Sequence, residues 1–273
     1  MNEETLRVEI AQLHHERFKP EINTETIIER IEKSTASLVV FPEMFLTGYT
    51  LGSDMVRFVQ DDDSPHLSAI RDSAVDNDRF VVFGFPAKSK EIRGQIHNTA
   101  GVFGPGGSVG RYDKLHLVDF GPFEEYAYFT PGASTFSFEV SGFRIGLSIC
   151  YDIFFPELTK TYALEGADCV ICISASPSIT RKFFEAVMKA RAVENTVYFI
   201  YSNLVGFDSR MDFWGGGAVI DPIGKEIVKG PYFEEEILEA EISAERIEQA
   251  RRSRPTLRDT RVDVVEGMLQ SRK

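Results

Sequence analysis

Cys150 is the side chain in this sequence with the clearest capacity for covalent chemistry. It directly follows an apolar run, residues 143–149, that is typical of a buried strand, and Pro156 could open a helix soon afterwards. A thiol at a strand end faces a cleft while its backbone is held rigidly, and amides of the adjoining turn can bind a developing oxyanion. A free thiol is mostly protonated at neutral pH, so it needs a base to act as a nucleophile. Position alone also fits a small buried hydrophobic residue.

Two carboxylates and one amine are candidates for the groups that such a thiol needs. Glu43 follows the apolar run 37–41 and Pro42, where a desolvated carboxylate has the raised pKa that suits a general base. Lys114 ends another strand pattern, where a fixed ammonium would favour the thiolate and stabilise an oxyanion. Glu125 could orient Lys114 or help to move protons. Taken singly, Glu43 also fits a loop carboxylate in water and Lys114 a solvated surface lysine.

Cys169 and Cys172 are spaced like half of a metal or redox site. They lie inside an apolar run that predicts a strand, where residues three apart point to opposite faces. No second Cys/His pair completes a zinc site. We therefore interpret both thiols as core residues and expect no metal there.

The elements that must position these residues follow from short apolar runs that alternate with amphipathic segments. Strands are predicted near residues 6–10, 37–41, 79–85, 99–103, 109–112, 143–149, 169–173 and 197–201. Helices are predicted near 24–33, with Asn23 as the cap, and near 156–165, 181–194 and 243–252. Turn signals at 104–107 and 221–224 predict hairpins. With no Pro-, Gly- or Ser-rich linker, one α/β domain with sheets inside and helices outside is the simplest architecture.

Composition and charge narrow the possible partners. The 273 residues are 43% hydrophobic and 26% charged, which is ordinary for a globular protein, and the formal net charge is -12. A chain that acidic is unsuited to nucleic acid, whose phosphates need clustered Lys and Arg, and to an anionic membrane surface. No apolar run approaches the ~18 residues that span a bilayer, and the acidic N-terminus does not look like a signal peptide. With three Cys residues as well, the sequence predicts a reducing, cytoplasmic location.

The candidate residues stand in motifs that resemble those of the carbon–nitrogen hydrolase (nitrilase-like amidase) superfamily. The similar segments, in the family's order, are 41–43 with 47–49, 112–117, 129–132, 150–152 with 155–157, and 214–216. The resemblance implies a four-layer αββα sandwich of two mixed sheets with helices outside, in a single domain. It also implies a triad of Glu43, Lys114 and Cys150, with Glu125 as an additional active-site carboxylate and with neither a metal nor an organic cofactor.

The resemblance further implies a division of the chain and an assembly. Residues 1–262 would form the hydrolase domain, and the C-terminal tail, residues 263–273, could lie at a subunit interface. Because members of the family usually pair, we expect a homodimer or a higher homo-oligomer.

The chemistry that the resemblance implies is hydrolysis of a small-molecule amide to a carboxylic acid and ammonia or an amine, through a thioester on Cys150. Candidates for the wall of a substrate pocket are Tyr49, Phe129, Tyr151, Ser174 and Trp214. Two alternatives stay open at this point: a nitrilase that uses the same thiol on a C≡N bond, and an inactive relative that serves as an interaction protein. The substrate itself is not indicated by the sequence.

Overall fold

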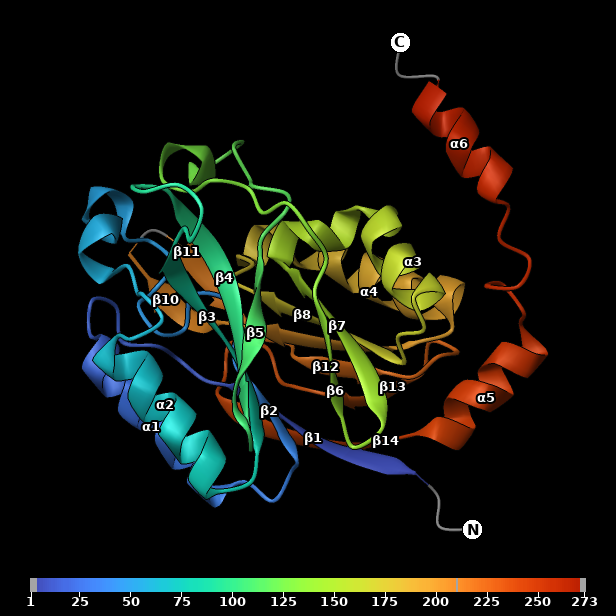
Figure 1. Cartoon of the computed structure of the whole chain (residues 1–273), viewed down its shortest axis with the longest axis horizontal. Coiled ribbons are helices and arrows are strands. Elements are labelled where there is room, and N and C mark those ends of the chain that lie inside the picture. Colours follow the sequence, from blue (N-terminus) through green and yellow to red (C-terminus); the bar gives the residue numbers. More distant parts are fainter. Residues whose placement is uncertain (1–3, 210, 271–273) are drawn as a thin grey trace.

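Two six-stranded β-sheets face each other in the computed structural model, which describes residues 4–209 and 211–270 (Figure 1). The first sheet has the order β14-β1-β2-β3-β4-β5, and the second β13-β12-β9-β8-β7-β6. The strands of the first sheet are β1 (Thr5–Gln12), β2 (Leu38–Val40), β3 (Phe80–Lys88), β4 (Ile96–Gly104), β5 (Gly107–Asp113) and β14 (Glu236–Ser243). Those of the second are β6 (Ser137–Val140), β7 (Phe143–Ile149), β8 (Cys169–Ser174), β9 (Tyr198–Asn203), β12 (Ala218–Ile220) and β13 (Glu226–Lys229). A separate two-stranded ribbon consists of β10 (Val205–Asp208) and β11 (Met211–Trp214).

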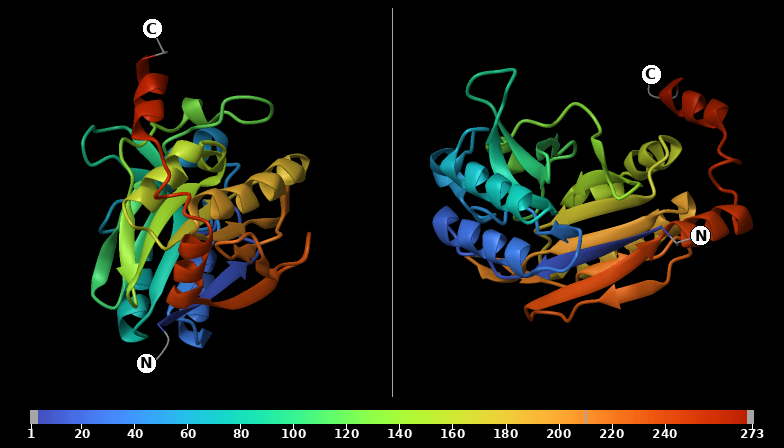
Figure 2. Two further views of the ribbon diagram at one scale, coloured as in Figure 1. Left: turned by 90° about the vertical axis from the view of Figure 1, so that its right-hand side faces the viewer. Right: turned by 60° about the horizontal axis from the view of Figure 1, so that its bottom comes forward.

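Helices cover the outer face of each sheet. The first sheet is covered by α1 (Pro20–Lys33) and α2 (Pro65–Asp76), and the second by α3 (Pro156–Leu164) and α4 (Arg181–Asn195) (Figures 1 and 2). The 3-10 turns are η1 (Gly52–Phe58), η2 (Glu125–Ala127), η3 (Cys150–Phe154) and η4 (Ser178–Thr180). After β14 come α5 (Ala244–Ser253) and α6 (Val262–Gln270), and Figure 2 shows α6 standing away from the layers. The layers are therefore αββα in a single domain, which confirms the predicted fold class.

Continuous apolar runs form the parallel strands at the centre of each sheet. β1, β2 and β3 pair in parallel, as do β7, β8 and β9, whereas the outer strands pair antiparallel. In β2, Val40 belongs to the core between the sheets, while Val39 belongs to the core under α1 and α2 together with Ile27. Both faces of such a strand are buried, which is why its sequence shows no polar alternation.

The directions of the strands bring several of their ends to one place. β5 runs parallel to β3 because each pairs antiparallel with β4, so the carboxyl ends of β2 and β5 lie at the same edge of the first sheet. In the second sheet, the carboxyl ends of β7 and β8 likewise share one edge. Residues that directly follow these four strands are therefore the ones that the fold can gather between the sheets.

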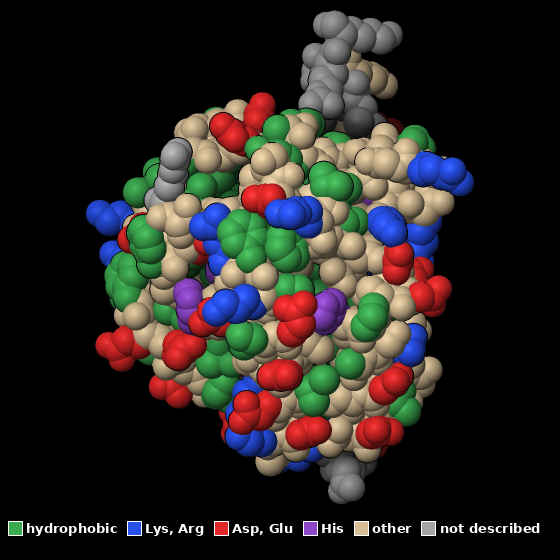
Figure 3. Space-filling view, turned by 90° about the vertical axis from the view of Figure 1, so that its left-hand side faces the viewer, with side chains coloured by type: hydrophobic (Ala, Val, Ile, Leu, Met, Phe, Trp, Pro, Cys, Tyr) green, Lys and Arg blue, Asp and Glu red, His purple; other side chains and the backbone are tan. Residues whose placement is uncertain are grey.

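The surface and the cysteines add three observations. On the face shown in Figure 3, acidic and basic side chains are interspersed with small groups of hydrophobic ones. None of the described helices is long and apolar enough to cross a lipid bilayer. All three cysteines are free and buried, and within residues 4–209 and 211–270 no cluster of three or more His, Cys, Asp or Glu is arranged to hold a metal ion.

Candidate active site

Cys150 stands where β7 turns sharply into η3. Its φ of 49° lies in the left-handed region, which a residue with a side chain adopts only when its surroundings impose it. Asp152 supplies part of that constraint, because its Oδ2 accepts the N–H of Ile149 at 3.0 Å and the hydroxyl of Tyr112 at 2.8 Å. Backbone N–H groups in the first turn of η3, including that of Tyr151, have no acceptor within the helix and can face a ligand.

Asp152 also joins the Cys150 turn to the segment after β5. Its Oδ1 accepts the backbone N–H of His116 at 2.9 Å and lies 2.7 Å from His116 Nδ1. The His116 ring stacks on Phe155, with ring centroids 3.5 Å apart. His116 is thus a packed and hydrogen-bonded residue that holds the neighbouring Lys114 at a fixed distance from the second sheet.

Glu43 lies shortly after β2, beyond Phe41 and Pro42, and is completely buried. Its Oε1 accepts from Lys114 Nζ at 2.9 Å and from Asn98 Nδ2 at 2.7 Å, and its Oε2 accepts the backbone N–H of Ala175 at 2.6 Å. Because Ala175 follows β8, this carboxylate links the two sheets. Burial raises the pKa of Glu43 above its ordinary value, although Lys114 opposes the shift.

Gly84 in β3 makes room for the turn that carries Glu43. A Cβ added at Gly84 would lie 2.2 Å from the backbone nitrogen of Met44 and 2.7 Å from the Cα of Glu43. The backbones are also hydrogen-bonded there, since the Gly84 N–H donates to the Pro42 carbonyl at 3.1 Å and the Leu46 N–H donates to the Gly84 carbonyl at 3.1 Å. Only glycine allows this close approach of two backbone segments.

Lys114 lies buried between two carboxylates. Its Nζ is 2.7 Å from Oε1 of Glu125 and 2.9 Å from Oε1 of Glu43. Glu125 is itself held by the hydroxyl of Tyr49, which donates to Oε1 at 2.7 Å, and by the N–H of Val118, which donates to Oε2 at 2.9 Å. Burial disfavours the ammonium, but the two carboxylates outweigh it and raise the pKa of Lys114 well above its ordinary value. Lys114 therefore stays cationic.

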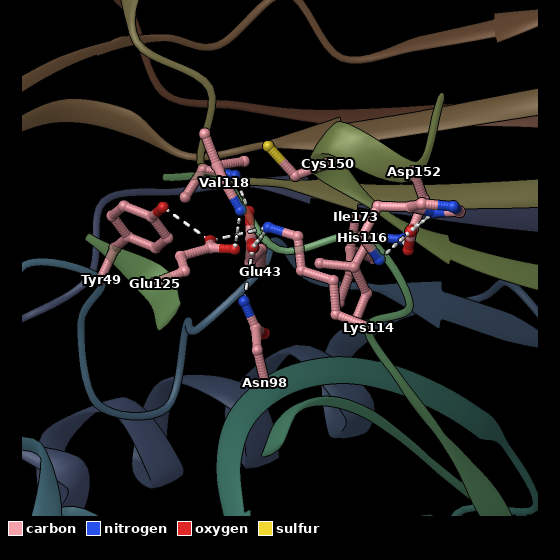
Figure 4. A network of polar contacts seen from close by, with 12 residues as sticks. Glu43, Tyr49, Asn98, Lys114, His116, Val118, Glu125, Cys150, Asp152 and Ile173 are labelled. Atoms are coloured by element: carbon pink, nitrogen blue, oxygen red, sulfur yellow. Dashed lines mark hydrogen bonds and ion pairs between the residues drawn. The ribbon is translucent and has the colours of Figure 1, made fainter. Parts of the chain in front are cut away.

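The Cys150 side chain lies beside this cluster (Figure 4). Burial, followed by the charge of Glu43, raises the pKa of Cys150 well above that of an ordinary thiol, while Lys114 and the Ser174 hydroxyl oppose the rise. At neutral pH the resting group is the thiol, with a buried carboxylate of raised pKa close by. The arrangement can transfer a proton from sulfur to Glu43 when the sulfur attacks an electrophile.

A cavity of about 370 Å³ opens onto Cys150. Its wall includes Tyr151, Phe154 of η3, Phe183 and Phe184 of α4, and Phe120 of the segment after β5. A second cavity, of about 510 Å³, shares Phe123 with the first, and Arg17, Glu125 and Tyr128 lie on its wall.

The four predicted catalytic residues are brought together by the fold, whereas the predicted pocket residues are not all in one place. Tyr151 lines the cavity at Cys150. Tyr49, hydrogen-bonded to Glu125, and Phe129 line the second cavity instead. Ser174 and Trp214 are completely buried, and the Trp214 indole N–H donates to the hydroxyl of Ser176 at 3.1 Å.

Sequence reasoning did not identify the other partners of the cluster. Asn98 was visible as part of a polar stretch, residues 97–99, inside an otherwise apolar strand, and such a stretch is a usable signal. The N–H groups of Ala175 and Val118 leave no trace in the sequence. The aromatic side chains Phe154 and Phe183 could not be told from core residues.

Comparisons with known proteins identify the family and agree with the fold. A model of the carbon–nitrogen hydrolase family matches residues 10–252. The 2-oxoglutaramate amidase of Bacillus subtilis is 30% identical over 250 residues, which are 90% of this chain and 94% of that protein. A glutamine-dependent NAD(+) synthetase of Aquifex aeolicus is 31% identical over 246 residues, 85% of this chain, but the match spans only 41% of the synthetase.

Among solved structures, a carbon–nitrogen hydrolase superfamily protein of Xanthomonas campestris, with an arsenic adduct in its active site, is similar with a TM-score of 0.86. It is 25% identical in sequence, and the match covers 94% of this chain and 97% of that one. The chain therefore belongs to the carbon–nitrogen hydrolase family and is an enzyme of the amidase type.

Proposed function

We propose that this chain hydrolyses the amide bond of a small molecule to a carboxylic acid and ammonia, through a thioester on Cys150. The observation that carries the proposal is a buried Lys114 held between Glu43 and Glu125, beside a thiol on a constrained strand-end turn. Burying such a charged cluster costs more than it returns in stability, so a chemical role is the better account of its presence. The cluster holds a base, a cation and a nucleophile together.

In the first half of the reaction, Cys150 Sγ attacks the amide carbon while Glu43 takes the thiol proton. Because burial raises the pKa of the Cys150 thiol well above its ordinary value, the proton stays on sulfur at rest and moves to Glu43 as the C–S bond forms. Lys114 Nζ and the N–H of Tyr151 donate to the oxyanion of the tetrahedral intermediate. When the C–N bond breaks, Glu43 returns the proton to nitrogen and ammonia leaves.

In the second half, water attacks the thioester carbon and Glu43 accepts its proton. The C–S bond then breaks, the proton passes to sulfur, and a carboxylic acid and the Cys150 thiol are formed. Glu125 acts through Lys114: its hydrogen bonds with Tyr49 and Val118 fix the carboxylate, and the carboxylate fixes the ammonium.

The proposal is tested by intact-protein mass spectrometry and ammonia release with a panel of primary amides. We expect an acyl adduct on Cys150, and we expect Cys150→Ala to lose both the adduct and the turnover. Cys169→Ala, which also removes a buried thiol, serves as the matched control and should retain both. Turnover by Cys150→Ala at the wild-type rate, or label found only on Cys169 or Cys172, would contradict the mechanism. Faster turnover of the matching nitriles would show that the substrate is a nitrile rather than an amide.

We also propose that the protein forms a homodimer and that the C-terminal tail contributes to it. Val262, Val264 and Val265 of α6 are 64%, 57% and 46% exposed, on a helix that stands away from its own layers (Figure 2). Apolar side chains presented in this way are stabilised by burial against a second copy. The last residues of the predicted tail, 271–273, lie outside the described residues.

Sedimentation velocity tests the assembly. The wild-type chain should sediment as a dimer or a larger species, and replacing the three valines by serine should raise the dissociation constant at least tenfold. A wild-type monomer, or a dimer with unchanged affinity in the triple variant, would contradict the proposed role of α6.

A further inference from the structure

We infer that the substrate of the Cys150 site is an amide with an uncharged, apolar acyl group about the size of a branched alkyl chain or a phenyl ring. The inference rests on the proposed function, because it concerns the group that the thioester would carry. It is drawn from the cavity that opens onto Cys150.

Aromatic rings make up most of the wall of this cavity. Phe120 meets Tyr151 edge to face, with ring centroids 5.5 Å apart, and Phe154 meets Phe184 in the same way at 5.0 Å. Phe183, one residue before Phe184 on α4, completes the rim. At about 370 Å³ the cavity exceeds the roughly 150 Å³ that suffices to bind benzene, so a ring or a branched alkyl group with a short linker fits.

The hydroxyl groups of Ser176 and Thr180 in the wall are already hydrogen-bonded to each other and to their neighbours. The Trp214 indole N–H donates to Ser176 Oγ at 3.1 Å, Ser176 Oγ lies 2.6 Å from Thr180 Oγ1, and Thr180 donates to the Pro177 carbonyl at 2.8 Å. Because Thr180 uses its proton on Pro177, Ser176 must donate to Thr180. Every hydrogen in this chain is therefore used, and neither hydroxyl can donate to a substrate.

A substrate carboxylate would find no positive charge in this wall. No Lys, Arg or His is among the described residues that line the cavity. The nearby Arg181 places its guanidinium over the ring of Tyr232, 4.6 Å from the centroid, and Lys114 is held by its two carboxylates. The Tyr151 hydroxyl is one neutral donor, which does not offset the cost of desolvating a carboxylate.

The acyl group is the part of the substrate that must occupy this cavity. The polar side of Cys150 is filled by buried, hydrogen-bonded groups of Glu43, Lys114 and Asn98, where ammonia is small enough to form and leave (Figure 4). After ammonia has left, the acyl chain is still bonded to sulfur and needs open space next to Cys150. The cavity that Cys150 lines is the one with the aromatic wall.

The first test compares two amides of nearly equal shape, 4-methylpentanamide and succinamate, in which an isopropyl group and a carboxylate occupy the same position. We expect kcat/KM to be at least about 100-fold higher for 4-methylpentanamide, because burying a carboxylate against aromatic rings without a partner costs several kcal/mol. An equal or higher kcat/KM for succinamate overturns the inference. If Cys150 is acylated in that case, the proposed amidase function still stands. If neither amide nor any other in the panel acylates Cys150, it is the proposed function that fails.

The second test places a cation at the rim. Phe183→Arg should raise kcat/KM for succinamate and reduce the selectivity at least tenfold. Phe183 is 64% exposed, so the substitution is compatible with folding, and Phe207→Arg, at a position 65% exposed and away from this cavity, is the matched control. An unchanged selectivity in Phe183→Arg, or the same change in Phe207→Arg, would show that the acyl group lies elsewhere.

Discussion

The floor and the mouth of the Cys150 site are built in opposite ways. The floor, defined as Glu43, Lys114 and Glu125, is buried, and its charged atoms are joined by hydrogen bonds. The mouth, defined as Phe120, Phe154 and Phe183, consists of aromatic rings on a loop, at the end of η3 and in the first turn of α4. Phe120 and Phe183 are 56% and 64% exposed. Catalysis needs groups in fixed positions, whereas selectivity can depend on exposed side chains that tolerate substitution. Substitutions in the floor should therefore lower kcat, and those in the mouth should alter KM.

The largest effect is expected from Lys114→Met. The variant loses the oxyanion donor and leaves two buried carboxylates without a cation, so kcat should fall about 1,000-fold and stability by roughly 3–5 kcal/mol. Steady-state kinetics and urea unfolding measure the two losses, and Lys182→Met, at an exposed lysine of α4, is the control. A kcat within tenfold of the wild type would show that catalysis does not depend on the floor.

Gly84→Ala tests whether the position of the floor matters as much as its composition. The new methyl group would collide with the backbone at Met44 and displace Glu43, which should lower kcat about 100-fold and reduce stability by about 1–3 kcal/mol. Gly106→Ala is the matched control, because a Cβ there meets nothing within 4 Å. If both variants behave alike, the close packing behind Glu43 has no bearing on turnover.

The pH profile tests the floor without any substitution. Glu43 acts as a base only when ionised, and its pKa is raised by burial, so activity is lost as the pH falls through that raised value. With a neutral amide, kcat/KM should decline about tenfold per pH unit on the acid side, with a midpoint above the ordinary 4.5. A midpoint at or below 4.5 would indicate that Glu43 is not the titrating base.

The smallest effect is expected from Phe120→Leu. This change keeps the mouth apolar but removes a ring that packs on Tyr151, so KM for an apolar amide should rise roughly 3- to 10-fold at an unchanged kcat. Initial rates over a range of substrate concentration separate the two constants. A fall in kcat as large as that of Gly84→Ala would show that mouth and floor substitutions do not differ in their effect on kcat.

The sequence predicted the floor much better than the mouth. Glu43 and Cys150 follow apolar strand patterns and Lys114 follows a more polar one, and strands that run in the same direction bring their ends to a common edge. Phe184 belongs to the buried stripe of α4, whereas its neighbour Phe183 is exposed. An apolar pair at this point of a helix looks the same in sequence whether it faces a core or a cavity. Only the packing of α4 against the turn after β7 distinguishes the two.

The start of α1 shows a second limit of sequence patterns. Asn23 was expected to cap this helix, but the helix begins at Pro20, and the Asn23 side chain donates to the carbonyls of Glu16 and Leu46 at 2.8 and 2.9 Å. The cap prediction was wrong because proline at the first position already starts the helix and leaves the asparagine free for the neighbouring loops. Partners distant in sequence, such as Leu46, are fixed by tertiary packing alone.

The hydrogen bond from the Ala175 N–H to Glu43 makes catalytic competence depend on the docking of the two sheets. Donor and acceptor lie 132 positions apart, so neither half of the chain contains a complete base. During folding, activity can appear only after both sheets have formed and closed on each other. During denaturation it is lost as soon as they separate, even while each sheet keeps its strands. Turnover therefore reports the closure of the two sheets, which spectroscopic measurements of secondary structure do not detect.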